Sequence, residues 1–262
     1  MFRAVGDRLG EANVLKAQGD VLAFLDERTE ALARYEEALG LFRAVGARLG
    51  EANVLKAQGD VLYFMKETSE ALARYEEALG LFRAVGARLG EANVLKAQGD
   101  VLAFLDERTE ALARYEEALG LFRAVGDRLG EANVLQAQGD VLYFMKETSE
   151  ALARYEEALG LFRAVGDRLG EANVLKAQGD VLAFLDERTE ALARYEEALG
   201  LFRAVGDRLG EANVLKAQGD VLAFLDERTE ALARYEEALG LFRAVGARLG
   251  EANVLKAQGT WL

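Results

Sequence analysis

Apolar residues recur every three or four positions in two consecutive stretches of the chain, a spacing typical of α-helices. In the first stretch, from about Arg8 to Phe24, they cover roughly half of the helix circumference at about 100° per residue, so this helix is expected to contact several neighbours. In the second, from about Thr29 to Val45, they form one narrower stripe. The apolar and small positions are Ala12, Val14, Leu15, Gly19, Val21, Leu22 and Leu25, followed by Ala31, Tyr35, Ala38, Phe42 and Val45.

Polar and glycine residues mark the ends of both predicted helices. Asp7 is expected to cap the first helix, because a short acidic side chain accepts hydrogen bonds from the free N–H groups of a first turn. Residues 25–28 form the turn between the helices. Gly46 follows the second helix, where a left-handed residue is usual. The pattern therefore predicts two antiparallel helices joined by a short turn.

This helix pair is repeated with a fixed period of 40 residues. The segment FRAVG at residues 2–6 returns at residues 42–46 and then at every fortieth position up to 242–246. One pair is too small to bury both stripes, so neighbouring pairs are expected to stack on one another. We predict a single array over residues 1–262 without a linker or a second domain. Its repeats are 1–40, 41–80, 81–120, 121–160, 161–200 and 201–240, with a partial seventh repeat at 241–262.

Composition removes most catalytic chemistry. The chain has no cysteine and no histidine, and therefore lacks thiolate nucleophiles, thiolate metal ligands and the commonest general base. Adjacent carboxylates such as Glu36 and Glu37 point about 100° apart on a helix and do not converge on one substrate. The sequence thus predicts no enzyme, no metal site and no cofactor.

Charge and hydropathy restrict the classes of partner that the chain is expected to bind. The net charge of −13 disfavours nucleic acid, whose phosphates bind Lys and Arg. The longest apolar stretches are too short to span a membrane, and the first residues do not resemble a secretory signal. We expect a cytoplasmic location, with neither nucleic acid nor membrane as a partner.

The residues of the pair resemble the tetratricopeptide repeat. The segment LxxQGxxL at residues 15–22, followed by AxxxYxxA at residues 31–38, is similar to the family pattern WxxLGxxY, then Ala, an aromatic residue four positions later, and Ala. The Gly, both Ala residues and the second aromatic match in every complete repeat, whereas Leu15, Gln18 and Leu22 depart from the pattern. The 40-residue period resembles Pins/LGN-type and bacterial signalling arrays. Armadillo and HEAT arrays share the period but fit the residue pattern less well.

The resemblance implies an all-α fold, a right-handed α-α superhelix (TPR-like solenoid) of six helix pairs plus a terminal helix. It also implies that the first helices line a concave groove that holds an extended peptide or a partner helix. The polar face of the first helix, with Asn13, Lys16, Asp20 and Ala23, corresponds to that groove. Family members that clamp a peptide carboxylate have Asn where Asp20 stands, so the resemblance does not extend to that clamp.

Repeated along the array, these positions form a polar ladder on the first helices. Sequence departures at Gln136, Tyr63 and Tyr143 fall on the same face. The alternative interpretation of the polar ladder is a solvated face without a ligand. The candidate peptide-binding residues are Asn13, Lys16, Asp20, Asn53, Lys56, Asp60, Tyr63, Asn93, Lys96, Asp100, Asn133, Gln136, Asp140, Tyr143, Asn173, Lys176, Asp180, Asn213, Lys216 and Asp220.

The two ends of the array lack the polar outer faces of capping repeats. Apolar residues there predict a possible head-to-tail homo-oligomer. These residues are Val14, Val254, Leu255, Trp261 and Leu262.

Two functions are therefore open. The first is a non-enzymatic protein-protein interaction scaffold that binds a protein or peptide, and the second is a structural or engineered array of near-identical repeats that mainly self-associates.

The aromatic residues Phe24, Tyr35 and Phe42 are expected in the core rather than in a binding platform. Gln18 lies within the apolar arc, so its amide is expected to find a buried partner such as the Tyr35 hydroxyl.

Overall fold

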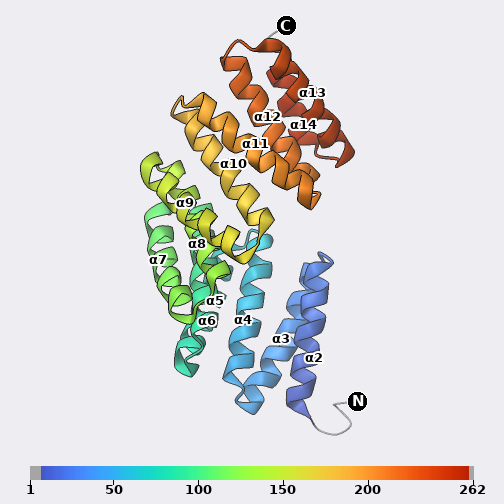
Figure 1. Ribbon diagram of the computed structural model, residues 1–262. Helices are drawn as coiled ribbons and strands as arrows, with labels where there is room; N and C mark the ends of the chain where they lie inside the picture. Colours follow the sequence, from blue (N-terminus) through green and yellow to red (C-terminus); the bar gives the residue numbers. More distant parts are fainter. Residues whose placement is uncertain (1–6, 260–262) are drawn as a thin grey trace. The chain divides into compact units, whose positions relative to one another are not determined.

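The computed structural model describes residues 7–259, which form thirteen α-helices and no strand (Figure 1). The predicted all-α solenoid class is confirmed: six consecutive antiparallel helix pairs are followed by one terminal helix. None of the described helices is both long and apolar enough to cross a membrane. The helices are α2 (Arg8–Phe24), α3 (Arg28–Val45), α4 (Arg48–Phe64), α5 (Thr68–Val85), α6 (Arg88–Phe104), α7 (Arg108–Val125), α8 (Arg128–Phe144), α9 (Thr148–Val165), α10 (Arg168–Phe184), α11 (Arg188–Val205), α12 (Arg208–Phe224), α13 (Arg228–Ala244) and α14 (Arg248–Gly259).

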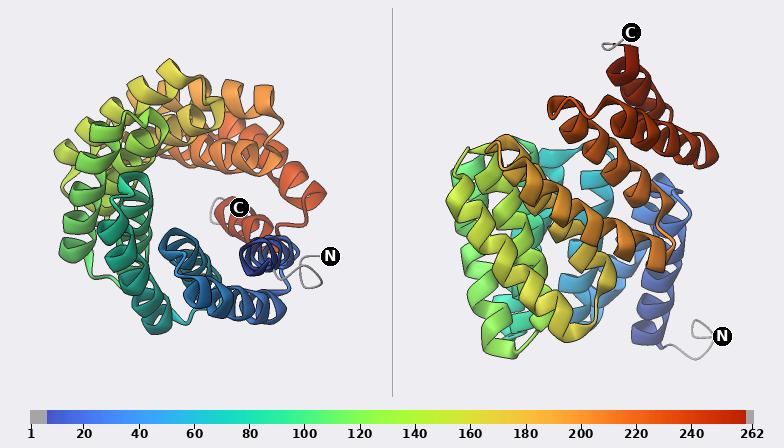
Figure 2. Two further views of the ribbon diagram at one scale, coloured as in Figure 1. Left: turned by 90° about the horizontal axis from the view of Figure 1, so that it is seen from below. Right: turned by 45° about the horizontal axis from the view of Figure 1, so that its top comes forward.

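The chain divides into two compact units, Met1–Gly130 and Glu131–Leu262. In the first unit, α2, α4 and α6 each pack against the second helix of their own pair, and α3 and α5 each pack against the next first helix. The second unit follows the same order from α9 through α13, and α14 packs on α13. Figure 2 shows this alternation of first and second helices in two further views.

Within each unit the first helices lie closer together than the second helices. Cα atoms come within 8 Å between α2 and α4 and between α4 and α6 in the first unit, and between α10 and α12 and between α12 and α14 in the second. Among the described helices, no two successive second helices of a unit approach this closely. Each unit therefore curves toward its first helices, which form its inner row.

The core lies between the two rows. Tyr35 and Phe42 are 2% and 1% exposed, as predicted, and they pack against first helices that carry small residues at the crossing. Gly59 marks such a crossing, because a Cβ atom there would lie only 2.5 Å from Cε1 of Tyr75. The small residues of the repeat thus admit the aromatic rings of the second helix.

The helix ends follow local rules. The Asp7 carboxylate accepts a hydrogen bond of 2.8 Å from the Gly10 N–H, which confirms the predicted cap. Gly46 ends α3 with a φ of 69°, and its left-handed conformation lets the next N–H reach back to the carbonyl oxygen of Phe42. Asp26, in the turn between the two helices, also has a positive φ of 65°.

Two predicted roles are wrong. Phe24 is 90% exposed rather than buried, because its spacing of four residues from Asp20 places it on the exposed polar face of α2. Gln18 is exposed and does not bond to Tyr35. The Tyr35 hydroxyl donates instead to Oδ1 of Asp20 at 2.9 Å, since a carboxylate is a stronger acceptor than an amide.

Candidate functional site

The polar ladder is built from a network that links the two helices of a pair. The Lys56 ammonium lies 2.7 Å from Oδ2 of Asp60 on the same helix, and the Tyr75 hydroxyl on the second helix donates to Oδ1 of Asp60 at 2.8 Å. One carboxylate therefore ties the first helix to the second. The same Lys, Asp and Tyr network occurs at 16, 20 and 35, at 96, 100 and 115, at 176, 180 and 195, and at 216, 220 and 235.

Each complete network presents a neutral ion pair. The Lys56 and Asp60 side chains are about one-third exposed, at 33% and 36%, so the pair faces solvent at one edge. A pair of this spacing contributes about 0.3–0.5 kcal/mol to stability. A ligand carboxylate would have to compete with Asp60 for the Lys56 ammonium. The Asn53 amide, which is exposed on the same helix, remains accessible beside the ion pair.

Burial and hydrogen bonding change the acidity of the tyrosines in these networks. Burial first, and then the charge and hydrogen bond of the Asp60 carboxylate, raise the pKa of Tyr75 well above its usual value of 10. The pKa of Tyr195 is raised by the same causes, with Asp180 as the carboxylate. The folded chain therefore favours the neutral hydroxyl, which is the form that donates to Asp.

This shift predicts alkaline unfolding. A raised pKa in the fold contributes stability that is complete below the unfolded value of 10 and is lost as the pH rises beyond it. We expect most tyrosinate absorbance to develop in the same narrow pH range, above 10, in which the helical circular dichroism is lost. Smooth titration of all tyrosines near pH 10 with the helices intact would contradict the network.

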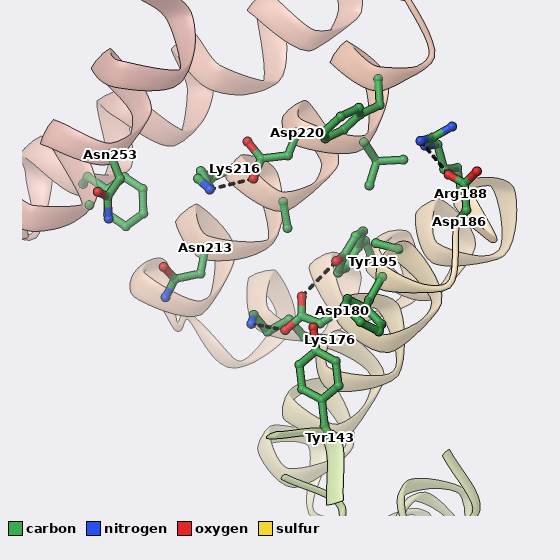
Figure 3. Close-up of a pocket in the computed structure, with 17 residues that line it drawn as sticks. Tyr143, Lys176, Asp180, Asp186, Arg188, Tyr195, Asn213, Lys216, Asp220 and Asn253 are labelled. Atoms are coloured by element: carbon green, nitrogen blue, oxygen red, sulfur yellow. Dashed lines mark hydrogen bonds and ion pairs between the residues drawn. The ribbon is translucent and has the colours of Figure 1, made fainter. Parts of the chain in front are cut away.

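In the second unit, the polar ladder borders a pocket of about 780 Å³ (Figure 3). Three successive first helices, α10, α12 and α14, supply most of its walls. Tyr143 of α8 lies at one side, with its ring edge-to-face against Phe184 at a centroid distance of 6.0 Å. The charged and amide-bearing residues that line it are Lys176, Asp180, Asp186, Arg188, Asn213, Lys216, Asp220 and Asn253.

A second, smaller pocket of about 270 Å³ lies one repeat earlier in the same unit. The structure thus brings predicted residues of neighbouring repeats to shared cavities, and Gln136 enters this pocket where the other repeats carry lysine. Predicted residues that line it are Gln136, Asp140, Tyr143, Asn173, Lys176 and Asp180. In the first unit the predicted residues occupy the same positions on α2, α4 and α6, from Asn13 to Asp100.

The sequence interpretation missed the phenylalanine that ends each first helix of the six complete repeats. Phe184 and Phe224 are 56% and 70% exposed, and both line the larger pocket. The guanidinium of Arg188 lies 5.3 Å from the centroid of the Phe224 ring, which places a cation over this aromatic surface. The missed signal was the spacing: Phe184 follows Asp180 by four residues, as Asp180 follows Lys176, so all three share one helix face.

The residues predicted for self-association are placed differently. Val14 and Leu255 are 43% and 45% exposed, whereas Val254 is fully buried within its own chain and offers no exposed surface. Trp261 and Leu262 lie outside the described residues. Within residues 7–259 no group of three or more acidic side chains is close enough to hold a metal ion.

Stacked antiparallel helix pairs with a repeated polar face define an α-solenoid. The model of the tetratricopeptide repeat family matches residues 2–84, 90–164 and 170–244, and the chain belongs to this family. The likeness to the 40-residue subclass remains a prediction. No curated protein sequence matches the chain.

Solved structures of low sequence identity share the fold. The apo form of RapI is 17% identical with a TM-score of 0.74, and the alignment covers 94% of this chain and 95% of that one. A Rap protein complexed with Competence and Sporulation Factor is 13% identical with a TM-score of 0.68, covering 94% and 73%. PilF from Pseudomonas aeruginosa is 21% identical with a TM-score of 0.68, covering 96% and 99%.

Proposed function

We propose that this chain is a non-enzymatic protein-protein interaction scaffold whose polar ladder binds an extended peptide or a partner helix. The observation that carries the proposal is the pocket of about 780 Å³, in which ladder residues of three successive first helices meet exposed aromatic rings. A Rap protein of the same fold was solved with Competence and Sporulation Factor bound, which supports a ligand-binding role. The lack of cysteine is compatible with the cytoplasmic location that we propose.

The pocket chemistry indicates the kind of segment that would bind. The Lys176 and Asp180 pair is neutral as a unit, so the wall selects weakly by charge. Asn213 supplies an amide that both donates and accepts, which suits a peptide backbone. Phe184 and Phe224 suit an apolar or aromatic side chain. We therefore expect an extended peptide with an apolar anchor and no requirement for a free carboxylate.

The experiment is selection from a mixed peptide library on a monodisperse sample, followed by titration of the selected peptides. Replacing Asn213 and Lys216 together with alanine is expected to weaken the selected peptides by at least about tenfold. Glu190→Ala is the matched control, because Glu190 is exposed in the first turn of α11 and is not among the residues that line the pocket. Equal peptide affinities for the unsubstituted chain, the Asn213→Ala with Lys216→Ala variant and the Glu190→Ala variant would contradict the proposal.

The second candidate function is a structural or engineered repeat array that associates head to tail. The exposure of Val14 and Leu255 at opposite ends of the described chain favours it. Light scattering distinguishes this candidate, since self-association raises the apparent mass above 28.6 kDa as the concentration increases. A mass that stays at the monomer value of 28.6 kDa at all concentrations rejects it.

A further inference from the structure

Two complete repeats carry a tyrosine where the others carry alanine, and each tyrosine packs on the phenylalanine that ends the next first helix. In the second unit, the ring of Tyr143 on α8 lies edge-to-face on Phe184 of α10, at an interplanar angle of 83° and a centroid distance of 6.0 Å. In the first unit, Tyr63 on α4 and Phe104 on α6 have the same arrangement, at 83° and 5.9 Å. The chain thus shows twice which group fits against this phenylalanine.

The next repeat of the second unit has the same phenylalanine without the tyrosine. Ala183 stands where Tyr143 stands one repeat earlier. Phe224 likewise corresponds to Phe184. Phe224 is 70% exposed, compared with 56% for Phe184, whose ring is in contact with Tyr143. Alanine therefore leaves uncovered a part of the phenylalanine ring that tyrosine covers in the preceding repeat.

A cavity lies beside this uncovered ring. Ala183, Arg188 and Phe224 all line the pocket of about 780 Å³, and we call the part of the pocket beside these three residues the Ala183 cavity. The smaller pocket of about 270 Å³, one repeat earlier, is lined by Tyr143 but not by Phe184, because the tyrosine ring packs there. The Ala183 cavity therefore has the phenylalanine of the tyrosine repeat and the free volume that a tyrosine would fill.

The polar surroundings of the Tyr143 ring recur at the Ala183 cavity. Tyr143 is directed toward Asp180 in Figure 3, and burial, followed by the negative charge of Asp180, raises the pKa of its hydroxyl. Asp220 corresponds to Asp180 and lines the same pocket as Ala183. A carboxylate can accept more than the two hydrogen bonds that Asp220 receives from its own chain. A phenol in the Ala183 cavity would therefore find an acceptor.

We propose that the Ala183 cavity binds an aromatic side chain, tyrosine or phenylalanine, of an extended peptide, with the ring edge-to-face on Phe224. The ring takes the position that Tyr143 takes on Phe184 one repeat earlier. This inference rests on the function proposed above and specifies the side chain that the ligand has to carry. Aromatic pairs in this geometry bind more strongly than their buried area alone explains, whereas a leucine gains only the burial. The cavity thus selects a ring and not only an apolar group.

An extended peptide fits the Ala183 cavity better than a second copy of the chain. The exposed phenylalanine rings of the described residues all end first helices, and a helix with its side chains is about 10–12 Å wide. The cavity lies between α10 and α12, whose Cα atoms approach within 8 Å of each other. A helix end is too wide to enter there, whereas a single side chain on an extended backbone can enter.

The first test compares four peptide sublibraries on the full chain. Each sublibrary has tyrosine, phenylalanine, leucine or alanine fixed at the central position, and all other positions are mixed. The unsubstituted chain is expected to retain the tyrosine and phenylalanine sublibraries at least about fivefold more strongly than the leucine and alanine sublibraries. Competition between the sublibraries at equal concentration measures this ratio.

The second test shows whether the peptide binds in the Ala183 cavity. Because the chain has no cysteine, Glu187→Cys allows a small trifluoromethyl tag to be attached between two residues that line the pocket. The fluorine NMR signal of this tag is expected to shift saturably with a peptide retained from the tyrosine sublibrary. Ala183→Tyr in the tagged chain should weaken this binding at least about tenfold, because the added ring fills the cavity.

Ala204→Tyr in the tagged chain is the matched control. It adds the same ring at an exposed position of α11 that does not line the pocket, and it should leave the affinity unchanged. Ala183→Tyr makes the sequence of α10 identical to that of α4, so the fold is expected to be retained. Circular dichroism of both variants checks this.

Three results would overturn the inference. They are equal retention of all four sublibraries, equal peptide affinities of the Ala183→Tyr and Ala204→Tyr chains, and self-association without peptide that Ala183→Tyr removes. The last result would assign the cavity to a second copy of the chain. If all four sublibraries bind equally and Asn213→Ala with Lys216→Ala weakens them, the proposed function stands and only the aromatic anchor is wrong. If no sublibrary is retained, both proposals are wrong.

Discussion

A single methyl group at Gly59 is expected to lower the free energy of unfolding by about 3 kcal/mol. In Gly59→Ala the new Cβ would lie 2.5 Å from Cε1 and 2.7 Å from Cδ1 of Tyr75. The ring has little room to retreat, because Tyr75 is 1% exposed and its hydroxyl is held by Asp60. Relief therefore requires α4 and α5 to separate, which opens the packed core between them.

Gly80→Ala is the matched control for this substitution. Gly80 also lies within a helix, but a Cβ atom there meets nothing within 4 Å. Chemical denaturation followed by circular dichroism should show the midpoint falling for Gly59→Ala and rising for Gly80→Ala. If both variants shift in the same direction, helix propensity rather than the Tyr75 contact determines the response at Gly59.

The bounds of the helices were predictable because the repeat supplies the same local signals six times. The predicted first helix, Arg8 to Phe24, agrees with α2, and the glycine at 46 ends α3 in the expected left-handed conformation. Stacking was also predictable, since a pair with two apolar stripes has to bury both. Helix propensity, capping residues and apolar periodicity all predict the same helix bounds, and for this reason the bounds could be predicted from the sequence.

The contacts between helices were not predictable in the same way. The sequence places Lys16 and Asp20 one turn apart and so predicts their ion pair, but it does not reveal that Tyr35 reaches the same carboxylate from the next helix. That contact depends on how two helices are rotated against each other. Phe24 was assigned to the core because it is aromatic, although its spacing from Asp20 places it on the polar face.

Identical residues also differ in burial because their neighbours differ. Val14 and Val54 stand in the same local sequence, yet their exposures are 43% and 0%. The difference is caused by α3, which packs on α4 but lies on the other side of α2. Local patterns therefore predict the helix, whereas the burial of its side faces depends on the position of the repeat in the stack.

The largest stabilisation is expected from replacing all six exposed glycines in the second helices with alanine. They have no packing role in the structure, since a Cβ atom at each meets nothing within 4 Å. Glycine inside a helix costs about 1 kcal/mol relative to alanine, because its backbone loses more freedom on folding. The positions are Gly40, Gly80, Gly120, Gly160, Gly200 and Gly240.

The six effects should add, because the positions are 40 residues apart and share no partners. We expect the free energy of unfolding of the array to rise by about 5 kcal/mol, provided that it unfolds cooperatively, and a variant with three of the six substitutions to show about half of that gain. Denaturant titrations at equal protein concentration measure the free energy of unfolding of the six-substitution and the three-substitution variants. An unchanged denaturation midpoint would mean that these glycines take part in a contact on the outer surface of the second helices. Loss of that contact in the variant would then appear as a change in apparent mass by light scattering. Their exposure along α3 and α5 makes the additive gain the expected result.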